Sequence, residues 1–107
     1  MKKGMVKLSA MYPNGEGKTF DMEYYCNKHI PMVAGLLGDA LKSVTVESGL
    51  GSAAPGSTAP YAAMGNLYFE SMESFQNTFG PNAEAIMADG PNYTNAEPTV
   101  QISEVIM

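Results

Sequence analysis

His29 is the single histidine of the chain, and it lies where an imidazole could move a proton in apolar surroundings. On a helical wheel, Tyr25, Cys26 and Val33 fall on the same face of the predicted first helix. An imidazole can donate or accept a proton near neutral pH, so this placement predicts an acid/base role for His29. A structural histidine that bonds a backbone carbonyl is the alternative, and the residues alone leave both open.

Cys26 precedes His29 by three residues, a spacing that brings two side chains together on a helix. A thiolate beside an imidazolium would be a nucleophile. The sequence supplies no third member and no oxyanion-binding motif, which favours a small buried core residue instead. As a neighbour of His29, Cys26 is nevertheless a candidate substrate contact. One histidine and one cysteine are too few for the usual metal sites, so no metal is expected.

Four tyrosines could orient a substrate through their hydroxyl groups: Tyr12, Tyr25, Tyr61 and Tyr68. Tyr12 ends the first predicted strand and Tyr68 lies in the third, so either could approach the imidazole from the sheet side. Tyr25 lies one helical turn before His29. Core packing is the alternative role for each, and Tyr12, Tyr25 and Tyr68, with Cys26, are the candidate substrate-binding residues.

The charge inventory narrows the class of ligand. The chain of 107 residues carries eleven acidic residues and six basic ones, for a net charge of −5, and all the basic residues are lysine. Nucleic-acid binding needs a basic surface, and arginine supplies the bidentate contacts to phosphates and carboxylates. A neutral, apolar or aromatic small molecule therefore fits best. Phosphate-loop and dinucleotide motifs are lacking, and haem propionates would lack arginine partners, so no cofactor is expected.

The chain is expected to be a cytoplasmic protein without a membrane anchor. No apolar run approaches the roughly 20 residues of a membrane-spanning helix. The basic start at Met1–Lys3 is not followed by the apolar segment of a signal peptide. A single cysteine excludes an internal disulfide framework and indicates a reducing compartment. Residues 5–107 are interpreted as one domain, and residues 1–4 as a short N-terminal extension.

The order of predicted elements indicates the fold. Alternating apolar residues predict strands over residues 5–12, 41–51, 61–71 and 100–107. One helix is predicted from about Phe20 to Gly38, capped by Thr19 and kinked or restarted at Pro31. A second helix is predicted from Ser71, split into two pieces at Gly80-Pro81. The order βαββαβ is typical of a ferredoxin-like α+β fold, with one antiparallel sheet and two helices on one face.

The other face of this sheet is also predicted to be apolar. Residues in the phase opposite the helices are mostly methionine, tyrosine and valine: Met5, Met11, Met64, Tyr68, Val105 and Met107. A sheet that is apolar on both faces needs a second cover. The economical cover is a second copy of the chain, which predicts a homodimer that closes a barrel between the two sheets.

Two segments resemble the EthD family, which is named for ethyl tert-butyl ether degradation. Residues 24–33 are similar to its first-helix signature, a tyrosine-rich helix followed by His-x-Pro. Residues 79–95 resemble its second helix and the following loop, and the similarity covers residues 5–107. The resemblance implies a dimeric α+β barrel, and it carries over His29 as a candidate functional residue, with Pro31 shaping the helix. Many such sequences have a histidine after Gly-Pro in the second helix, where this chain has Asn82, so a mechanism that needs two histidines is in doubt.

What the resemblance implies about function is a small protein of an oxidative degradation pathway. His29 would be the general acid or base, and a tyrosine would orient a carbonyl or hydroxyl group. Cofactor-independent oxidation, isomerisation and dehydration would all suit such a site. A non-catalytic dimer that binds a ligand or supports a partner oxygenase is the alternative, and a purely structural dimer is a third. The sequence leaves open whether the protein is an enzyme.

Overall fold

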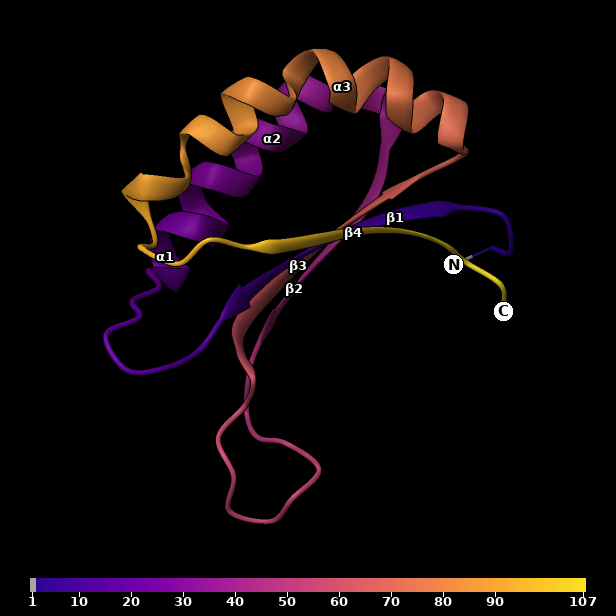
Figure 1. Ribbon diagram of the computed structural model, residues 1–107. Helices are drawn as coiled ribbons and strands as arrows, with labels where there is room; N and C mark the ends of the chain where they lie inside the picture. The colour runs from indigo at the N-terminus through magenta and orange to yellow at the C-terminus, as the bar shows by residue number, and fades with distance from the viewer. Residues whose placement is uncertain (1) are drawn as a thin grey trace.

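The fold is an antiparallel sheet with helices on one face, as seen in a computed structural model that describes residues 2–107 (Figure 1). The strands are β1 (Val6–Pro13), β2 (Leu41–Ser48), β3 (Tyr61–Phe69) and β4 (Thr99–Glu104). Their order in the sheet is β2-β3-β1-β4, and all three pairings are antiparallel. The predicted ferredoxin-like α+β class is confirmed.

The first helix begins two residues later than predicted. The Asp21 carboxylate caps α1 (Met22–Tyr24) by accepting a hydrogen bond from the Tyr24 N–H at 3.0 Å. Thr19, the predicted cap, instead bonds a distant loop: its N–H donates to the Asn95 side chain at 2.9 Å, and its carbonyl accepts from the Thr94 hydroxyl. The predicted Thr19 cap is therefore wrong, and contacts with the distant loop decide where the helix starts.

Pro31 restarts the helix, as predicted, but the turn before it is widened. Proline has no N–H for the carbonyl four residues earlier, and its ring crowds that carbonyl. The chain responds with a π-helical segment (Tyr25–His29), in which the Ile30 N–H donates to the Tyr25 carbonyl five residues earlier. The helix then continues as α2 (Ile30–Leu37). Pro31 thus sets the geometry of the turn that carries His29.

The second helix, α3 (Met72–Ala88), is continuous. Its start is capped as predicted, since the Ser71 hydroxyl accepts a hydrogen bond from the Ser74 N–H at 3.1 Å. The predicted break at Gly80-Pro81 is wrong: Pro81 lies inside the helix, which follows a curved path beside α2 (Figure 1). Phe79 and Ile86, on either side of Pro81, both pack on the core. This apolar contact offsets the one hydrogen bond that proline cannot make.

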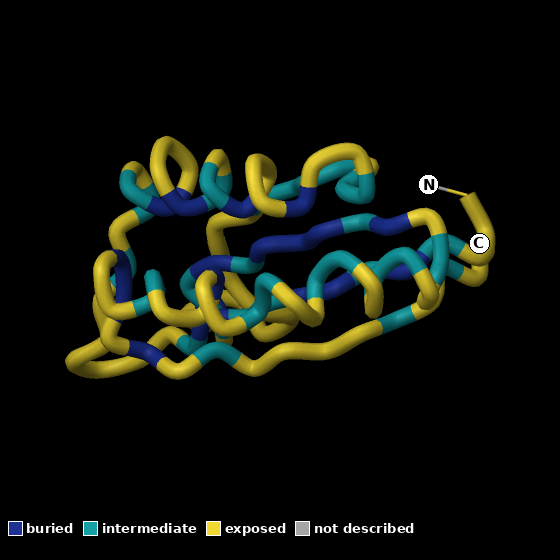
Figure 2. The backbone as a smooth tube through the Cα atoms, turned by 90° about the horizontal axis from the view of Figure 1, so that it is seen from above, coloured by how far each residue is buried: buried dark blue, intermediate teal, exposed yellow. Residues whose placement is uncertain are grey.

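The core lies between the helices and the sheet. Buried stretches follow the strands and the inner sides of the helices (Figure 2). In the long connection from β2 to β3, residues 49–58 are exposed. Phe69 in β3 and Val33 in α2 are the core's most completely buried large side chains. No helix within residues 2–107 has the length and apolar character needed to cross a bilayer.

The sheet face away from the helices is more polar than predicted. Along its centre, Ser9 donates a hydrogen bond to Asn66 at 2.9 Å, and Asn66 donates to Thr45 at 3.1 Å, which links β1, β3 and β2. Met11 and Met64 are paired opposite each other on this face and are half-buried. The prediction of an apolar face is therefore wrong for the centre of this face, where polar side chains form hydrogen bonds with one another.

Candidate functional site

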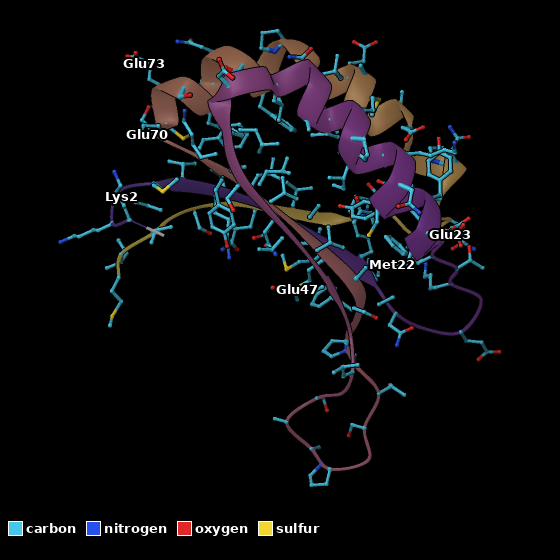
Figure 3. The ribbon with its side chains drawn as sticks, turned by 180° about the vertical axis from the view of Figure 1, so that it is seen from behind. Lys2, Met22, Glu23, Glu47, Glu70 and Glu73 are labelled. Atoms are coloured by element: carbon cyan, nitrogen blue, oxygen red, sulfur yellow. The ribbon has the colours of Figure 1, made fainter. Side chains whose placement is uncertain are left out.

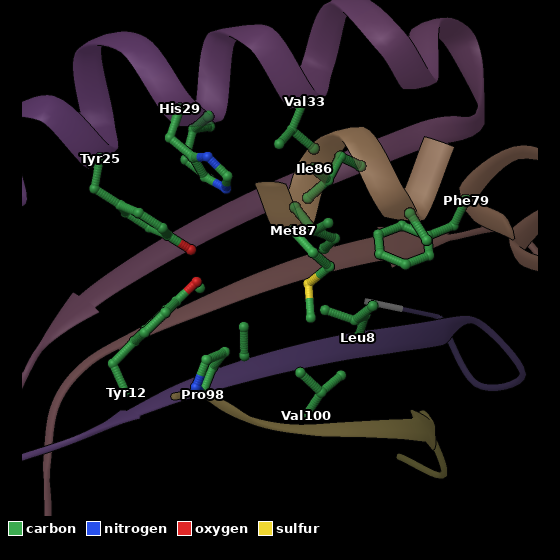
Figure 4. A pocket seen from close by; sticks show the side chains of 15 residues that line it. Leu8, Tyr12, Tyr25, His29, Val33, Phe79, Ile86, Met87, Pro98 and Val100 are labelled. Atoms are coloured by element: carbon green, nitrogen blue, oxygen red, sulfur yellow. The ribbon is translucent and has the colours of Figure 1, made fainter. Parts of the chain in front are cut away.

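A cavity of about 170 Å³ lies between the helices and the sheet. Side chains of β1, β3 and β4 form one wall, and the π-helical segment, α2 and α3 form the other (Figure 4). The lining is apolar except for His29, Tyr12 and Tyr25, which lie at one end. Apolar protein cavities of roughly 150 Å³ accept benzene. This cavity therefore has room for a molecule of about one ring.

His29 is held by a carboxylate from the other helix. Its Nδ1 lies 2.9 Å from Oδ2 of Asp89, the residue that ends α3. The other oxygen of Asp89 accepts hydrogen bonds from the Tyr24 hydroxyl at 2.9 Å and from the Asn92 amide at 2.8 Å. The His29 side chain is only 4% exposed, and its imidazole points into the cavity (Figure 4). Because Nδ1 is engaged by Asp89, Nε2 is the ring nitrogen left for a ligand.

Asp89 is ionised at neutral pH. Partial burial raises its pKa, but hydrogen bonds from Asn92, His29 and Tyr24 outweigh that effect, so the pKa lies below its usual value of 3.8. An ionised carboxylate accepts hydrogen bonds only, so in the neutral imidazole it selects the tautomer with the proton on Nδ1. In that tautomer the free electron pair is on Nε2, which can accept a proton at the cavity.

Two aromatic rings fix the plane of the imidazole. Tyr25 stacks on it, with ring centroids 5.1 Å apart and planes 19° apart, and Tyr93 lies 4.7 Å away. The Tyr93 hydroxyl is in turn 2.7 Å from the Tyr12 hydroxyl. His29, Tyr25, Tyr93 and Tyr12 therefore form one connected cluster, which holds the ring without filling the cavity.

The hydroxyl groups of Tyr25 and Tyr93 keep their protons at neutral pH. Burial is the main cause that raises the pKa of Tyr25 and of Tyr93 far above the usual value, and the neighbouring Tyr12 adds to it. Neutral phenols donate hydrogen bonds, whereas phenolates only accept them. The polar end of the cavity therefore combines a proton acceptor with hydrogen-bond donors.

Gly65 in β3 makes room for Tyr25. A Cβ atom at this position would overlap the Tyr25 hydroxyl, so the ring can lie over the strand only because residue 65 has no side chain. Glycine weakens a strand and often marks a close approach of another group. Here the approaching group is a side chain of the site itself.

Replacing Gly65 with alanine is expected to lower the free energy of unfolding by about 1–3 kcal/mol, because the new methyl group overpacks the site. In a Tyr25→Phe background the same change should cost clearly less, since the overlapping oxygen is gone. Chemical denaturation of the four proteins in this cycle measures the difference.

Gly35→Ala is the matched control, because a Cβ on Gly35 in α2 meets nothing within 4 Å. It should leave stability unchanged or slightly raised. Strict additivity of Gly65→Ala and Tyr25→Phe would contradict the close contact between these residues.

The structure brings together only some of the predicted site residues. His29, Tyr12 and Tyr25 line the same cavity. Cys26 is exposed and does not line it, because the π-helical segment holds more residues per turn than the helical wheel assumed. Tyr68 lies on the opposite face of the sheet, since it follows the inward-facing Leu67 and neighbouring strand residues alternate. Neither Cys26 nor Tyr68 therefore lines this cavity, in contrast to His29, Tyr12 and Tyr25.

Three residues of the site were missed by the analysis of the sequence: Asp89, Tyr93 and Gly65. Asp89 is 60 residues from His29 in the chain, and nothing in its spacing connects the two. Its one signal in the sequence is an acidic residue directly before Gly90-Pro91, a pair that is typical of a turn. Within residues 2–107, no three His, Cys, Asp or Glu side chains are grouped to hold a metal ion.

Known proteins that are similar to this chain in sequence and structure belong to one family. A family model described as "EthD domain" matches residues 14–97. The crystal structure of an EthD-like protein from Ralstonia eutropha JMP134 is 40% identical, with a TM-score of 0.89, over 99% of this chain and 96% of that one. An ethyl tert-butyl ether degradation (EthD) family protein from Bacillus halodurans C-125 is 24% identical, with a TM-score of 0.68, over 95% and 99%.

A more distant structure shares the fold alone. It is described as a dimeric protein of unknown function with a ferredoxin-like fold, from Bacteroides fragilis NCTC 9343. It is 13% identical, with a TM-score of 0.57, over 97% of this chain and 99% of that one. No curated protein sequence matches the chain.

Proposed function

The chain belongs to the EthD domain family, and we propose that it binds a small, neutral, mainly apolar or aromatic molecule and acts on it by proton transfer. The observation that carries this proposal is the His29–Asp89 pair, which presents Nε2 to a mainly apolar cavity. A proton acceptor positioned in this way contributes typically 10²- to 10⁴-fold to a reaction rate. Oxidation without a cofactor, isomerisation and dehydration can each begin with such a proton transfer.

The charges around the cavity support a neutral ligand. No lysine lines it, and the chain has no arginine. The ionised Asp89 behind His29 would repel an anion that approached the imidazole. Charged side chains such as Glu23, Glu70 and Glu73 lie on the outer surface (Figure 3). An anionic ligand would therefore lose its hydration without gaining a cationic partner.

We also propose that a second copy covers the sheet face that bears Ser9, Asn66 and Met64. Ser9 and Asn66 are buried although none of the helices lies on this side, and the half-buried methionines beside them remain available for contact. The protein from Bacteroides fragilis, which shares the fold, is described as dimeric. A homodimer of this kind is compatible with catalysis and equally with an accessory role beside a partner oxygenase in an oxidative degradation pathway.

The single histidine allows a direct test of binding. Phenylacetone and phenylacetate are similar in size but differ in charge, and each can be titrated while the ring protons of His29 are followed by NMR. Phenylacetone is expected to shift the His29 signals in a saturable way, because it is neutral and apolar. Phenylacetate is expected to leave them in place, because no lysine or arginine of residues 2–107 lines the cavity and Asp89 lies behind the imidazole.

Two alanine positions on the helices provide a matched control. Ala83 lines the cavity from α3, so Ala83→Phe should fill the cavity and abolish the shift. Ala34 in α2 is exposed, so Ala34→Phe should leave the shift intact. Absence of any response to phenylacetone would contradict the binding proposal, and an equal response to phenylacetate would contradict the preference for neutral ligands.

A further inference from the structure

We infer that the natural ligand is a neutral carbonyl compound with a C–H bond next to the carbonyl, and that the site enolises it. This inference rests on the proposed binding and proton transfer at the same cavity. It adds a substrate class and a reaction, and it follows from the placement of one acceptor and two donors at one end of an apolar space.

The acceptor is Nε2 of His29. An enolisation begins when a base removes the proton from the carbon beside the carbonyl. The C–H bond breaks, the new N–H bond forms on Nε2, and the imidazole becomes a cation. Asp89, 2.9 Å from Nδ1, stabilises that cation, because it is already ionised and hydrogen-bonded on its other oxygen by Tyr24 and Asn92. The base therefore gains a proton without leaving an unpaired buried charge.

The donors are the hydroxyls of Tyr12 and Tyr25, whose ends converge beside the imidazole (Figure 4). As the C–H bond breaks, its electron pair forms the carbon–carbon double bond, and the carbonyl π pair moves to oxygen. Hydrogen-bond donors placed at that oxygen stabilise the charge that develops there. Either oxygen of the Tyr12–Tyr93 pair can donate, so Tyr93 can donate to Tyr12 and leave the Tyr12 proton for the ligand.

The rest of the cavity suits the remainder of such a molecule. Leu8, Val100 and Met87 face the space beyond the polar end (Figure 4). Their apolar surface would hold a ring or an alkyl chain. The proton returns from Nε2 to the same carbon, which restores the carbonyl compound. Where a carbon–carbon double bond adjoins that carbon, the enolate extends over it, and return of the proton to the far end of that double bond completes an isomerisation. Neither path needs an oxidant or a reductant.

Deuterium exchange into phenylacetone tests the inference. In D₂O, loss of the proton signal from the methylene group beside the carbonyl reports each round of enolisation. The protein is expected to accelerate this exchange about 10²-fold or more over buffer at equal pH. His29→Gln should reduce the rate to that of buffer, and Tyr25→Phe should lower it about tenfold or more through loss of one donor. If His29→Gln fails to fold, His29→Asn replaces it.

Binding and exchange are read separately, so the two proposals can fail separately. Cys26→Ser is the matched control on the same helical segment, and it should exchange phenylacetone as fast as the unmodified protein because Cys26 is exposed to solvent. A saturable His29 shift with no exchange above buffer would overturn the enolisation and leave the binding proposal standing. No shift and no exchange would overturn both.

Discussion

Asp89→Asn is expected to lower the proton-exchange rate that depends on His29 by about 100-fold or more while the domain stays folded. The asparagine amide can donate a hydrogen bond to Nδ1, which moves the ring proton to Nε2. The electron pair then faces the amide instead of the cavity, and the site loses its base. The corresponding substitution in a serine-protease triad lowers turnover roughly 10⁴-fold for the same reason. Asp89 is thus a positioning residue that acts through His29.

The position of the ring proton can be measured directly. A long-range ¹H–¹⁵N correlation spectrum distinguishes the protonated from the unprotonated ring nitrogen, and the chain has one histidine to assign. The unmodified protein should show the proton on Nδ1, and Asp89→Asn should show it on Nε2. Asn92→Ala is the matched control, because it removes one donor to Asp89 but leaves the carboxylate. An unchanged nitrogen pattern in Asp89→Asn would contradict this account of the pair.

Phe69→Ala is expected to lower the free energy of unfolding by about 3–5 kcal/mol, the range for deleting a buried aromatic ring. Phe69 has no exposed surface, and its ring meets that of Phe75 edge-on at a centroid distance of 5.2 Å. It also belongs to the core cluster that joins β1, β3, α2 and α3. Its removal would leave a void between the sheet and the helices, where closely packed side chains surround it on both sides. For a domain of this size, each kcal/mol corresponds to a drop in Tm of about 4–8 °C.

Thermal and chemical unfolding measure this loss. Leu50→Ala is the control, because Leu50 is 98% exposed in the β2–β3 connection, and the change should stay within about 0.5 kcal/mol. Phe69 does not line the cavity, so the folded variant should still show the phenylacetone shift at low temperature. A cost similar to that of Leu50→Ala would mean that Phe69 is not at the centre of the core.

The periodicity of apolar residues in the sequence determined which faces of the strands and of the first helix are buried, and the order of these elements indicated the fold. Strand alternation in residues such as Leu8 and Leu67 indicated which face each strand buries, because successive side chains point to opposite sides. The order of strands and helices then indicated a ferredoxin-like sheet. The helical repeat placed His29 and Tyr25 on the inner face, since one buried stripe is what a helix on a sheet presents. The chain has six lysines, no arginine and eleven acidic residues, and this excess of negative charge indicated a neutral ligand.

Tertiary structure decided the features that depend on contacts between distant segments. The loop after α3 meets the first helix, and only that contact makes Asp89 the partner of His29, 60 residues away. The segment before Pro31 is π-helical, whereas the helical wheel assumed an α-helix. The wider turn changes the angular position of Cys26, which lies at the surface. Gly65 matters because the Tyr25 ring packs against it and leaves no room for a side chain at that position. Sequence periodicity reports which residues are buried, whereas the identity of their partners depends on long-range packing that no local pattern encodes.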